Sequence, residues 1–472
     1  MKKRKISNIL IIRPDAIGDF INITPVLCAI KKNDPNIKIT LLASKANYSI
    51  AKIHPMIDEI IIDKIKSREV RNVFDYLNYV KELKQKHFDA ALIYYNEFPY
   101  AFLAYLSGIP VRVGDKDKVL LSVFYNGGTH INNADQTKHV MEYNLQYLEA
   151  IGFNTGDCKL SLPPPQKDYP ISGNPLIGIH LGYVGGTAAK RKLPKEKYAE
   201  AVKKIFNYFP QATIVLLGTE EMAEDANYIY MEPRRLPRDI SRGSAAGSIL
   251  NLIGKTNIYQ LMSIISKLSV YIGVDTGPTH IAAAYGIPMV FINAIKSPKP
   301  QRWAPLYSPK VIVKFRDKCP FVCHYANCQK TICSDSISTD EVANGVKQLL
   351  AGGTAHDEFL YSFYKSNNIV FIADKLPPIA KMLEDKGLSV SLYPKNKFNV
   401  FNIKNILDQL TYEDATIIHS KVKRPFLFKI LEWISPSRLL TPPLILFNNK
   451  VWESADELIK YYIERFKAKT RV

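Results

Sequence analysis

The chain has 472 residues, of which 47% are hydrophobic and 23% are charged. This composition is ordinary for a soluble globular protein and excludes a disordered, collagen-like or low-complexity chain. The 63 Lys and Arg against 44 Asp and Glu give a net charge of +19, and the sequence pI is about 9.4. This high positive net charge favours anionic partners. It does not distinguish between nucleic acid, a phosphorylated glycolipid, a membrane surface and a sugar nucleotide.

The amino-terminal segment begins like a signal peptide but does not continue as one. Its apolar run covers only residues 9–12 before Arg13 and Asp15 interrupt it, whereas a signal core needs about 7–15 apolar residues. No stretch approaches the roughly 20 apolar residues that span a bilayer. We therefore expect a cytoplasmic protein, at most peripheral on the inner face of the cytoplasmic membrane.

In chain order, the first 162 residues alternate short apolar runs with amphipathic stretches. The spacing predicts strands over residues 9–12, 38–43, 59–62, 91–95 and 111–113, and helices over 19–32, 70–86 and 139–151. Strands and helices that alternate at this spacing predict βαβ units and a parallel sheet.

A proline-rich segment at residues 163–175 predicts a linker, because three consecutive prolines stiffen the chain and cannot donate ladder hydrogen bonds. A second α/β series follows over residues 176–352. It predicts strands at 176–181, 213–217, 270–274 and 288–292, and helices at 194–208, 220–230, 261–268 and from about 279. Two doubly wound units joined by a linker leave a cleft at the carboxyl ends of their strands, where ligands bind.

Residues 353–472 predict a basic accessory extension of unknown role. Strands are expected at 369–373 and 390–393 with a helix between them, so the extension is α/β or helical. From residue 421 onwards, 11 Lys or Arg stand against 5 Asp or Glu among aromatic and leucine-rich runs. This tail either rests on an anionic membrane surface or forms a small domain with its own aromatic core.

The first chemical motif runs from Arg13 to Asp19 and is followed by Asn22. It lies where the first strand ends and a helix begins, and Gly18 allows a tight turn and close approach of a ligand. The free N–H groups of a helix start attract anions or sugar oxygens. Asp19 is a candidate general base, and the alternative is that it only caps the helix.

The second motif is a loop rich in glycine and threonine that precedes three cations and Pro194. Thr187, Lys190 and Arg191 in this loop form a plausible cradle for a diphosphate, with glycine N–H groups beside the positive charges. The spacing is not that of a P-loop. The alternative is a flexible surface loop with solvated charges.

Two further motifs follow predicted strands of the second unit. Asp275, Thr276, Gly277 and His280 open a helix of small residues, and this cluster contains more polar groups than capping requires. Glu220 and Glu221 follow the strand at 213–217, where a carboxylate can bind ribose hydroxyls. Acidic residues that merely favour the helix dipole are an equal alternative for these glutamates.

Metal-binding signals are weak in this sequence. Four cysteines fall within fifteen residues, but their spacing lacks the paired C-x2-C steps of zinc ribbons, so reduced thiols are favoured over metal ligation and disulfides. These are Cys319, Cys323, Cys328 and Cys333. Asp115 and Asp117 form an Asp-x-Asp pair with interleaved lysines, for which a solvated loop is expected. We expect no metal and no cofactor.

Two motifs and the segments between them carry a family resemblance. ILIIRPDAIGDFINITPVLCAIKK at residues 9–32 closely resembles the amino-terminal signature of glycosyltransferase family 9, the lipopolysaccharide heptosyltransferases. VYIGVDTGPTHIAAAYGIP at residues 270–288 resembles the second signature of that family. The pieces GTAAKRKLP and LLGTEE lie between them in the same order, and the resemblance covers about residues 7–350.

The resemblance implies a GT-B fold, with two Rossmann-like domains facing a central cleft. The first domain, residues 1–162, would be the acceptor side, and the second, residues 176–352, would bind the nucleotide sugar. Family members are inverting transferases that move heptose from ADP-heptose to the inner core of lipopolysaccharide. A phosphorylated glycolipid or oligosaccharide would be the acceptor.

Several residues match family positions. Asp19 matches the general base, with Arg13, Gly18 and Asn22 in the acceptor-side loop. The positions at which the family contacts the nucleotide sugar correspond to Asp275, Thr276, Gly277 and His280. Lys190 or Arg191 corresponds to the basic residue of the family. Glu221 or Glu220 corresponds to the acidic residue that binds the ribose.

The sequence also departs from the family pattern. Leu193 stands where the family usually has Trp, and the last 120 or so residues exceed the usual family length. A different nucleotide sugar, a sugar-nucleotide epimerase and a non-catalytic glycolipid-binding homologue are therefore alternatives. Nucleic-acid binding has only the net charge in its favour, because the chain contains no motif for it.

Overall fold

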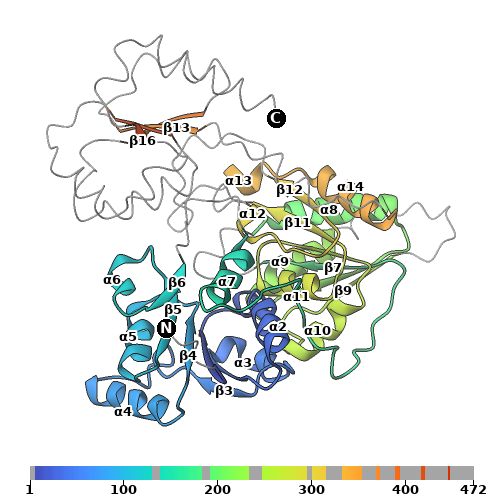
Figure 1. Ribbon diagram of the computed structural model, residues 1–472. Helices are drawn as coiled ribbons and strands as arrows, with labels where there is room; N and C mark the ends of the chain where they lie inside the picture. Colours follow the sequence, from blue (N-terminus) through green and yellow to red (C-terminus); the bar gives the residue numbers. More distant parts are fainter. Residues whose placement is uncertain are drawn as a thin grey trace, which may run out of the picture.

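The computed structural model describes residues 6–129, 139–182, 192–232, 247–294, 300–314 and 332–352 (Figure 1). It also describes four short strands at 368–372, 389–393, 416–419 and 445–446. Within these described residues, no helix is both long enough and apolar enough to cross a membrane.

The amino-terminal unit is built on a six-stranded parallel sheet in the order β3-β2-β1-β4-β5-β6. The strands are β1 (Asn8–Arg13), β2 (Lys38–Ala43), β3 (Glu59–Ile62), β4 (Ala90–Ile93), β5 (Val111–Asp115) and β6 (Gly127–Thr129). The helices are α1 (Ile17–Ile21), α2 (Thr24–Asn33), α3 (Lys45–Lys52), α4 (Val73–Lys84), α5 (Phe98–Leu106), α6 (Val119–Ser122) and α7 (Val140–Glu149). Residues 9–12 of the central strand β1 are all apolar and fully buried, as expected for a strand of a parallel sheet with helices on both faces.

The second unit repeats this architecture with the strand order β12-β11-β10-β7-β8-β9. Its strands are β7 (Leu176–His180), β8 (Thr213–Leu217), β9 (Ser248–Asn251), β10 (Val270–Gly273), β11 (Met289–Asn293) and β12 (Lys310–Lys314). Its helices are α8 (Lys195–Tyr208), the short 3-10 helix η2 (Glu220–Met222), α9 (Ala223–Met231), α10 (Ile258–Ser266), α11 (Gly277–Ala284), α12 (Pro300–Trp303), α13 (Ile332–Asp335) and α14 (Thr339–Leu350).

In each sheet, the strand order reverses direction at one place. The chain moves outward from β1 through β2 to β3 and then returns to place β4 on the other side of β1. In the second sheet, the same reversal separates β7 from β10. The loops after these strand pairs diverge to opposite faces, so the carboxyl ends of β1 and β4, and of β7 and β10, are the positions where such sheets bind ligands.

The two units pack directly against each other (Figure 1). Helix α3 contacts α10, and the Tyr259 hydroxyl donates to the Ser49 carbonyl at 3.2 Å. The Tyr285 hydroxyl reaches the Pro163 carbonyl in the segment between the units at 2.9 Å. A disulfide joins Cys28 of α2 to Cys158 after α7, a pairing that the cysteine spacing did not predict.

A third parallel sheet lies in the carboxy-terminal part, in the order β14-β13-β15-β16. Its strands are β13 (Asn368–Ile372), β14 (Ser389–Tyr393), β15 (Thr416–His419) and β16 (Ile445–Leu446). The two strands expected here exist within one residue of their predicted starts. The expected helix between them and the basic tail from residue 421 lie outside the described residues, apart from β16.

The helix expected over residues 19–32 is wrong as a single element, because it is divided into α1 and α2. Pro25 has no N–H to donate to the Ile21 carbonyl, and the Thr24 hydroxyl bonds that carbonyl instead at 2.8 Å. The helix expected at 220–230 likewise starts as η2 and continues as α9. Helices α3 and α5 were not predicted: α3 has only eight residues, and α5 is apolar along nearly its whole length, which hides its periodicity.

Candidate functional site

The candidate site lies where the amino-terminal ends of α1 and α11 meet across the two units. A Cβ atom placed on Gly18 would lie 2.7 Å from Cδ2 of His280, and one on Gly277 would lie 3.1 Å from Cβ of Ile17. A Cβ atom at Gly18 therefore does not fit unless His280 shifts, whereas one at Gly277 would require Ile17 to move by only a few tenths of an ångström. The contact brings the ends of β1 and β10 together, although about 260 residues of chain separate them.

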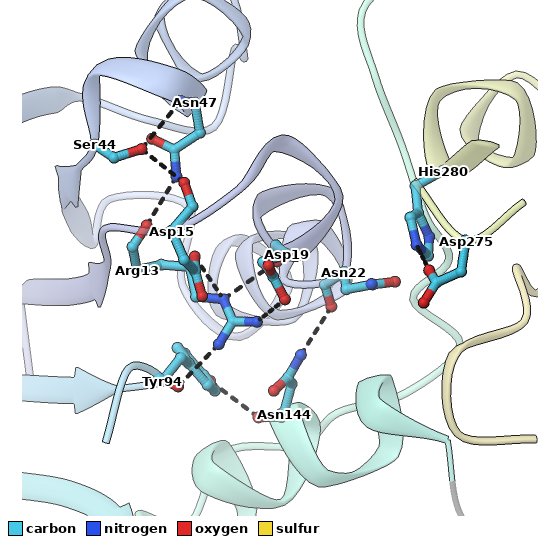
Figure 2. Close-up of polar contacts among 10 residues, drawn as sticks. All are labelled: Arg13, Asp15, Asp19, Asn22, Ser44, Asn47, Tyr94, Asn144, Asp275 and His280. Atoms are coloured by element: carbon cyan, nitrogen blue, oxygen red, sulfur yellow. Dashed lines mark hydrogen bonds and ion pairs between the residues drawn. The ribbon is translucent and has the colours of Figure 1, made fainter. Parts of the chain in front are cut away.

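Arg13 organises the amino-terminal side of the site (Figure 2). Its guanidinium is almost fully buried and donates from Nη2 to Oδ1 of Asp19 at 2.8 Å and from Nη1 to the Tyr94 carbonyl at 2.8 Å. Its Nε also lies 3.3 Å from Oδ1 of Asp15. Burial acts against the Arg13 charge, but the two carboxylates outweigh it and raise the pKa of Arg13 above its ordinary value.

Asp19 is oriented by Arg13 rather than by helix capping. The N-cap position of α1 is occupied by Ala16, and no side chain caps the helix. The Asp19 side chain is 26% exposed, and within the described residues Arg13 is its one side-chain hydrogen-bond donor. The carboxylate is thus held in a fixed direction while one oxygen stays available to a ligand.

Asp15 is a second carboxylate beside Arg13, and no motif in the sequence indicates a role for it. Burial raises the pKa of Asp15 to about 7, against the opposing effect of the Arg13 charge, and the nearby Asp19 raises it further. The turn that carries Asp15 is fixed by hydrogen bonds from α3 and its cap: Ser44 Oγ donates to the Asp15 carbonyl at 2.6 Å, and Asn47 Nδ2 to the Arg13 carbonyl at 2.8 Å.

Asn22 points from the end of α1 toward His280 and Asp275 (Figure 2). It is 1% exposed, and neither its Oδ1 nor its Nδ2 has a hydrogen-bond partner within the described residues. Its backbone carbonyl is held by Nδ2 of Asn144 at 3.1 Å. A buried amide without partners costs about 1–3 kcal/mol, so a polar ligand between the two units would satisfy it.

The second unit supplies a polar cluster at the end of β10. Nε2 of His280 lies 3.3 Å from Oδ1 of Asp275, and Nδ1 of His280 is buried without a partner in the described part of the chain. Thr276 is the N-cap residue of α11, and its hydroxyl lies 3.4 Å from Nδ1 of His180 at the end of β7. Burial lowers the pKa of His180 to about 4, so this imidazole is neutral.

The other predicted donor contacts lie along the same sheet edge or outside the described residues. Glu220 and Glu221 form η2 directly after β8, next to β7, and hydrogen bonds from Thr219 and from the backbone of Glu221 lower the Glu221 pKa. Thr187, Lys190 and Arg191 lie outside the described residues. Lys192, which follows them, forms an ion pair with Asp225, so its charge is already engaged.

Among the described residues, no group of three or more His, Cys, Asp or Glu side chains is close enough to hold a metal ion. Cys319, Cys323 and Cys328 are outside that part of the chain, and Cys333 is half-buried in α13. The expectation of a solvated Asp115 is wrong: Asp115 is 2% exposed, and its Oδ1 accepts from the Asp117 backbone at 3.0 Å. It is buried because it ends a strand inside the sheet.

Comparisons with known proteins agree with this architecture. The sequence profile of glycosyltransferase family 9 (heptosyltransferase) matches residues 76–330, more than half of the chain. A provisionally named glycosyltransferase of Haemophilus influenzae is 25% identical over 319 residues, which cover 63% of this chain and 86% of that protein. Lipopolysaccharide heptosyltransferase 3 of Escherichia coli is 23% identical over 281 residues, 58% of this chain and 79% of that protein.

Solved structures share the fold. A family 9 glycosyl transferase from Veillonella parvula matches with a TM-score of 0.56 and 18% identity, over 75% of this chain and 99% of that one. The heptosyltransferase WaaC of E. coli with ADP matches with a TM-score of 0.54 and 17% identity, over 74% of this chain and 100% of that one.

Two parallel sheets whose ligand-binding edges meet define the GT-B class of glycosyltransferases, and the expected GT-B fold is confirmed. Within that class, the chain belongs to glycosyltransferase family 9. The matched residues include the motif at 275–280, whereas the motif at 13–22 precedes them. The roles of individual residues therefore depend on the geometry above.

The glycine contact can be tested with Gly18→Val. The added side chain collides with buried His280, so we expect the free energy of unfolding in urea to fall by about 1–3 kcal/mol. Ala16→Val is the control, because Ala16 is exposed and has extended backbone at the start of the same helix. Equal stability of the two variants would contradict the close approach of α1 and α11.

The unusual pKa of Asp15 predicts a pH-dependent stability difference. A carboxyl whose pKa rises on folding stabilises the folded chain at low pH, and this contribution is lost between about pH 4 and 7. Asp15→Asn cannot ionise. As the pH rises from 4.5 to 8, the unfolding free energy of the wild type should therefore fall relative to Asp15→Asn, by an amount on the order of 2 kcal/mol.

The control for this comparison is Asp157→Asn, which changes an exposed carboxylate. Its stability should follow that of the wild type at every pH. Parallel stability curves for the wild type and Asp15→Asn would show that Asp15 is an ordinary carboxylate.

Proposed function

We propose that the protein is an inverting glycosyltransferase that moves heptose from ADP-heptose to the lipopolysaccharide core or a related surface glycan. The observation that carries the proposal is the contact of α1 with α11. It places the carboxylate of Asp19 opposite the cluster of Asp275 and His280, with the unpaired amide of Asn22 between them. Within the described residues, the amide of Asn22 on one side and Nδ1 of His280 on the other are buried without hydrogen-bond partners, and a bound polar ligand would satisfy both.

Asp19 acts in this proposal as the general base. It takes the proton of the acceptor hydroxyl as that oxygen attacks the anomeric carbon, and the bond from that carbon to the diphosphate breaks on the opposite face. Arg13 fixes the direction of the carboxylate, and this positioning lowers the entropic part of the barrier. Asn22 would bond a sugar hydroxyl through its free amide.

The leaving diphosphate gathers negative charge, which the second unit would stabilise. At the start of α11, Pro278 has no N–H, and the N–H groups of Thr279 and His280 donate to the Thr276 carbonyl. The Gly277 N–H and the positive end of the helix would therefore contact the diphosphate. Lys190 or Arg191 would supply cations, and Glu220 or Glu221 would bond the ribose. Because fixed amides and cations can stabilise this charge, we propose that transfer needs no divalent metal.

Asp15 shares the Arg13 guanidinium with Asp19: Oδ1 of Asp15 lies 3.3 Å from Nε, and Oδ1 of Asp19 lies 2.8 Å from Nη2. Burial raises the pKa of Asp15 to about 7, so Asp15 changes its charge beside Arg13 near neutral pH. In this proposal Asp15 helps Arg13 to position the Asp19 carboxylate.

The cellular setting belongs to the same proposal. A phosphorylated glycolipid acceptor fits the net charge of +19, and a position on the inner face of the cytoplasmic membrane would bring the enzyme to it. The Cys28–Cys158 disulfide is the feature against a cytoplasmic location, because disulfides are rare in reducing compartments. We propose no nucleic-acid partner.

Asp19→Asn tests the proposed base. The amide keeps the size of the side chain but cannot accept the proton, so kcat should fall by about 10²–10⁴-fold. The dissociation constant for the nucleotide sugar, measured by calorimetry, should stay within about threefold, because Asp19 lies on the acceptor side. The exposed variant Asp157→Asn is the control and should keep full turnover.

Two results would count against this role. Turnover of Asp19→Asn equal to that of the control would remove Asp19 as the base. A parallel loss of donor binding and turnover would instead assign Asp19 to the donor side of the site.

A further inference from the structure

Exposed apolar side chains are concentrated on three neighbouring helices of the first unit. Among the described residues, seven of the eleven exposed large hydrophobic side chains lie on α4, α5 and the α6 region. They are Val73, Phe74, Leu77, Phe98, Tyr105, Leu120 and Val123. Leu120 is 85% exposed, Phe74 74% and Val123 71%. We call this set the apolar face. Single exposed apolar residues are normal, but a group of this kind marks an interaction surface.

Ring contacts make the apolar face continuous from one helix to the next. The ring of Phe124 lies against those of Phe98, Phe102 and Tyr105, with centroids 5.5–5.7 Å apart. Phe102 in turn stacks on Tyr76 of α4 at 6.1 Å. The three helices also lie together at the outer side of the first unit, away from the second (Figure 1). The exposed apolar side chains therefore belong to helices that pack against one another on one side of the first unit.

Positive charge surrounds the apolar face. Residues 64–84, which lead into α4 and form it, contain six Lys or Arg and three Asp or Glu. Arg68, Arg71, Lys81 and Lys84 are exposed and form no ion pair within the described part of the chain. Arg112 lies over the Tyr105 ring, with Cζ 5.3 Å from its centroid. A partner that covers this surface must accept apolar side chains and carry negative charge.

The basic segment also leads toward the candidate site. Lys66 lies over the ring of Tyr95, with Nζ 3.8 Å from its centroid. The Tyr95 N–H donates to the Ile12 carbonyl, one residue before Arg13. The basic segment thus reaches, through Lys66, the strand end that carries the acceptor-side residues.

We propose that the apolar face, together with the cations at residues 66–71, docks the enzyme on an anionic lipid bilayer. Apolar side chains enter the headgroup region while Arg and Lys contact anionic lipid headgroups, each worth a several-fold gain in partition. The docking proposal adds a binding surface to the proposed function. It rests on that function in one respect, namely that the acceptor is a glycolipid with a lipid anchor in the membrane. A docked first unit would hold its acceptor-side residues near that glycolipid.

The test uses the full chain and flotation with vesicles of phosphatidylethanolamine and phosphatidylglycerol. Phe74→Ser/Leu77→Ser removes part of the apolar face, and Arg68→Glu/Arg71→Glu reverses two charges. The matched controls are Met231→Ser/Leu250→Ser, at exposed positions of the second unit, and Lys167→Glu/Lys255→Glu, with the same charge change elsewhere. All four variants change exposed side chains, and thermal unfolding checks that they fold.

We expect the wild type and both controls to float with these vesicles and to bind phosphatidylcholine vesicles much more weakly. Each test variant should lose about tenfold or more in partition coefficient. Donor binding, measured by calorimetry on the same variants, should be unchanged. That readout separates failure of the docking proposal from failure of the proposed transferase function.

If the partition coefficients of both test variants were within twofold of the wild-type value, the proposal would be overturned. Membrane binding would then have to come from elsewhere, with the basic tail from residue 421 as the next candidate. Absence of wild-type binding above the phosphatidylcholine background would overturn it too. If ultracentrifugation showed a wild-type dimer that the Phe74→Ser/Leu77→Ser variant could not form, the apolar face would be an interface between copies instead.

Discussion

The close contact between Gly18 and the start of α11 is the constraint on which the site depends. Each sheet alone places its polar residues at the carboxyl ends of its central strands, as doubly wound sheets do. Neither set is a complete site, because the carboxylate of Asp19 belongs to one unit and the Asp275–His280 pair to the other. The glycine at position 18 allows the two helix ends to approach until a Cβ atom would collide with His280. A site for two substrates then forms between units that each fold around a sheet of their own.

One buried cation, Arg13, holds the two carboxylates on the amino-terminal side of the site. Arg13 at the end of β1 bonds Asp19, approaches Asp15 and bonds the carbonyl at the end of β4, so one guanidinium joins two loops and two carboxylates. Because the guanidinium is buried, removal of either carboxylate leaves the Arg13 charge to be compensated by the other carboxylate alone. Burial raises the pKa of Asp15 to about 7, and the Arg13 charge opposes that rise, so the charge state of this turn depends on both.

Most of the fold could be predicted from the sequence because buried parallel strands are short apolar runs. The strands at residues 38–43, 59–62 and 213–217 match their predicted limits fully. The break between α1 and α2 was missed, although Pro25 marks it, because the apolar spacing continues through the break. The motifs at 13–22 and 275–280 identified both sides of the site, but their contact could not be predicted, since spacing along a chain does not measure distance across it. The importance of Asp15 depends on burial, which no motif reports.

The most direct test of the account is calorimetric binding of nucleotide sugars in the presence of EDTA. ADP-heptose should bind to the wild-type protein, with UDP-, GDP- and dTDP-sugars at least about tenfold weaker, and EDTA should not change the affinity. Preference for another nucleotide would keep the fold and the mechanism but contradict ADP-heptose as the donor. Binding of none of these nucleotide sugars would contradict the central claim that the contact between α1 and α11 forms a transferase site.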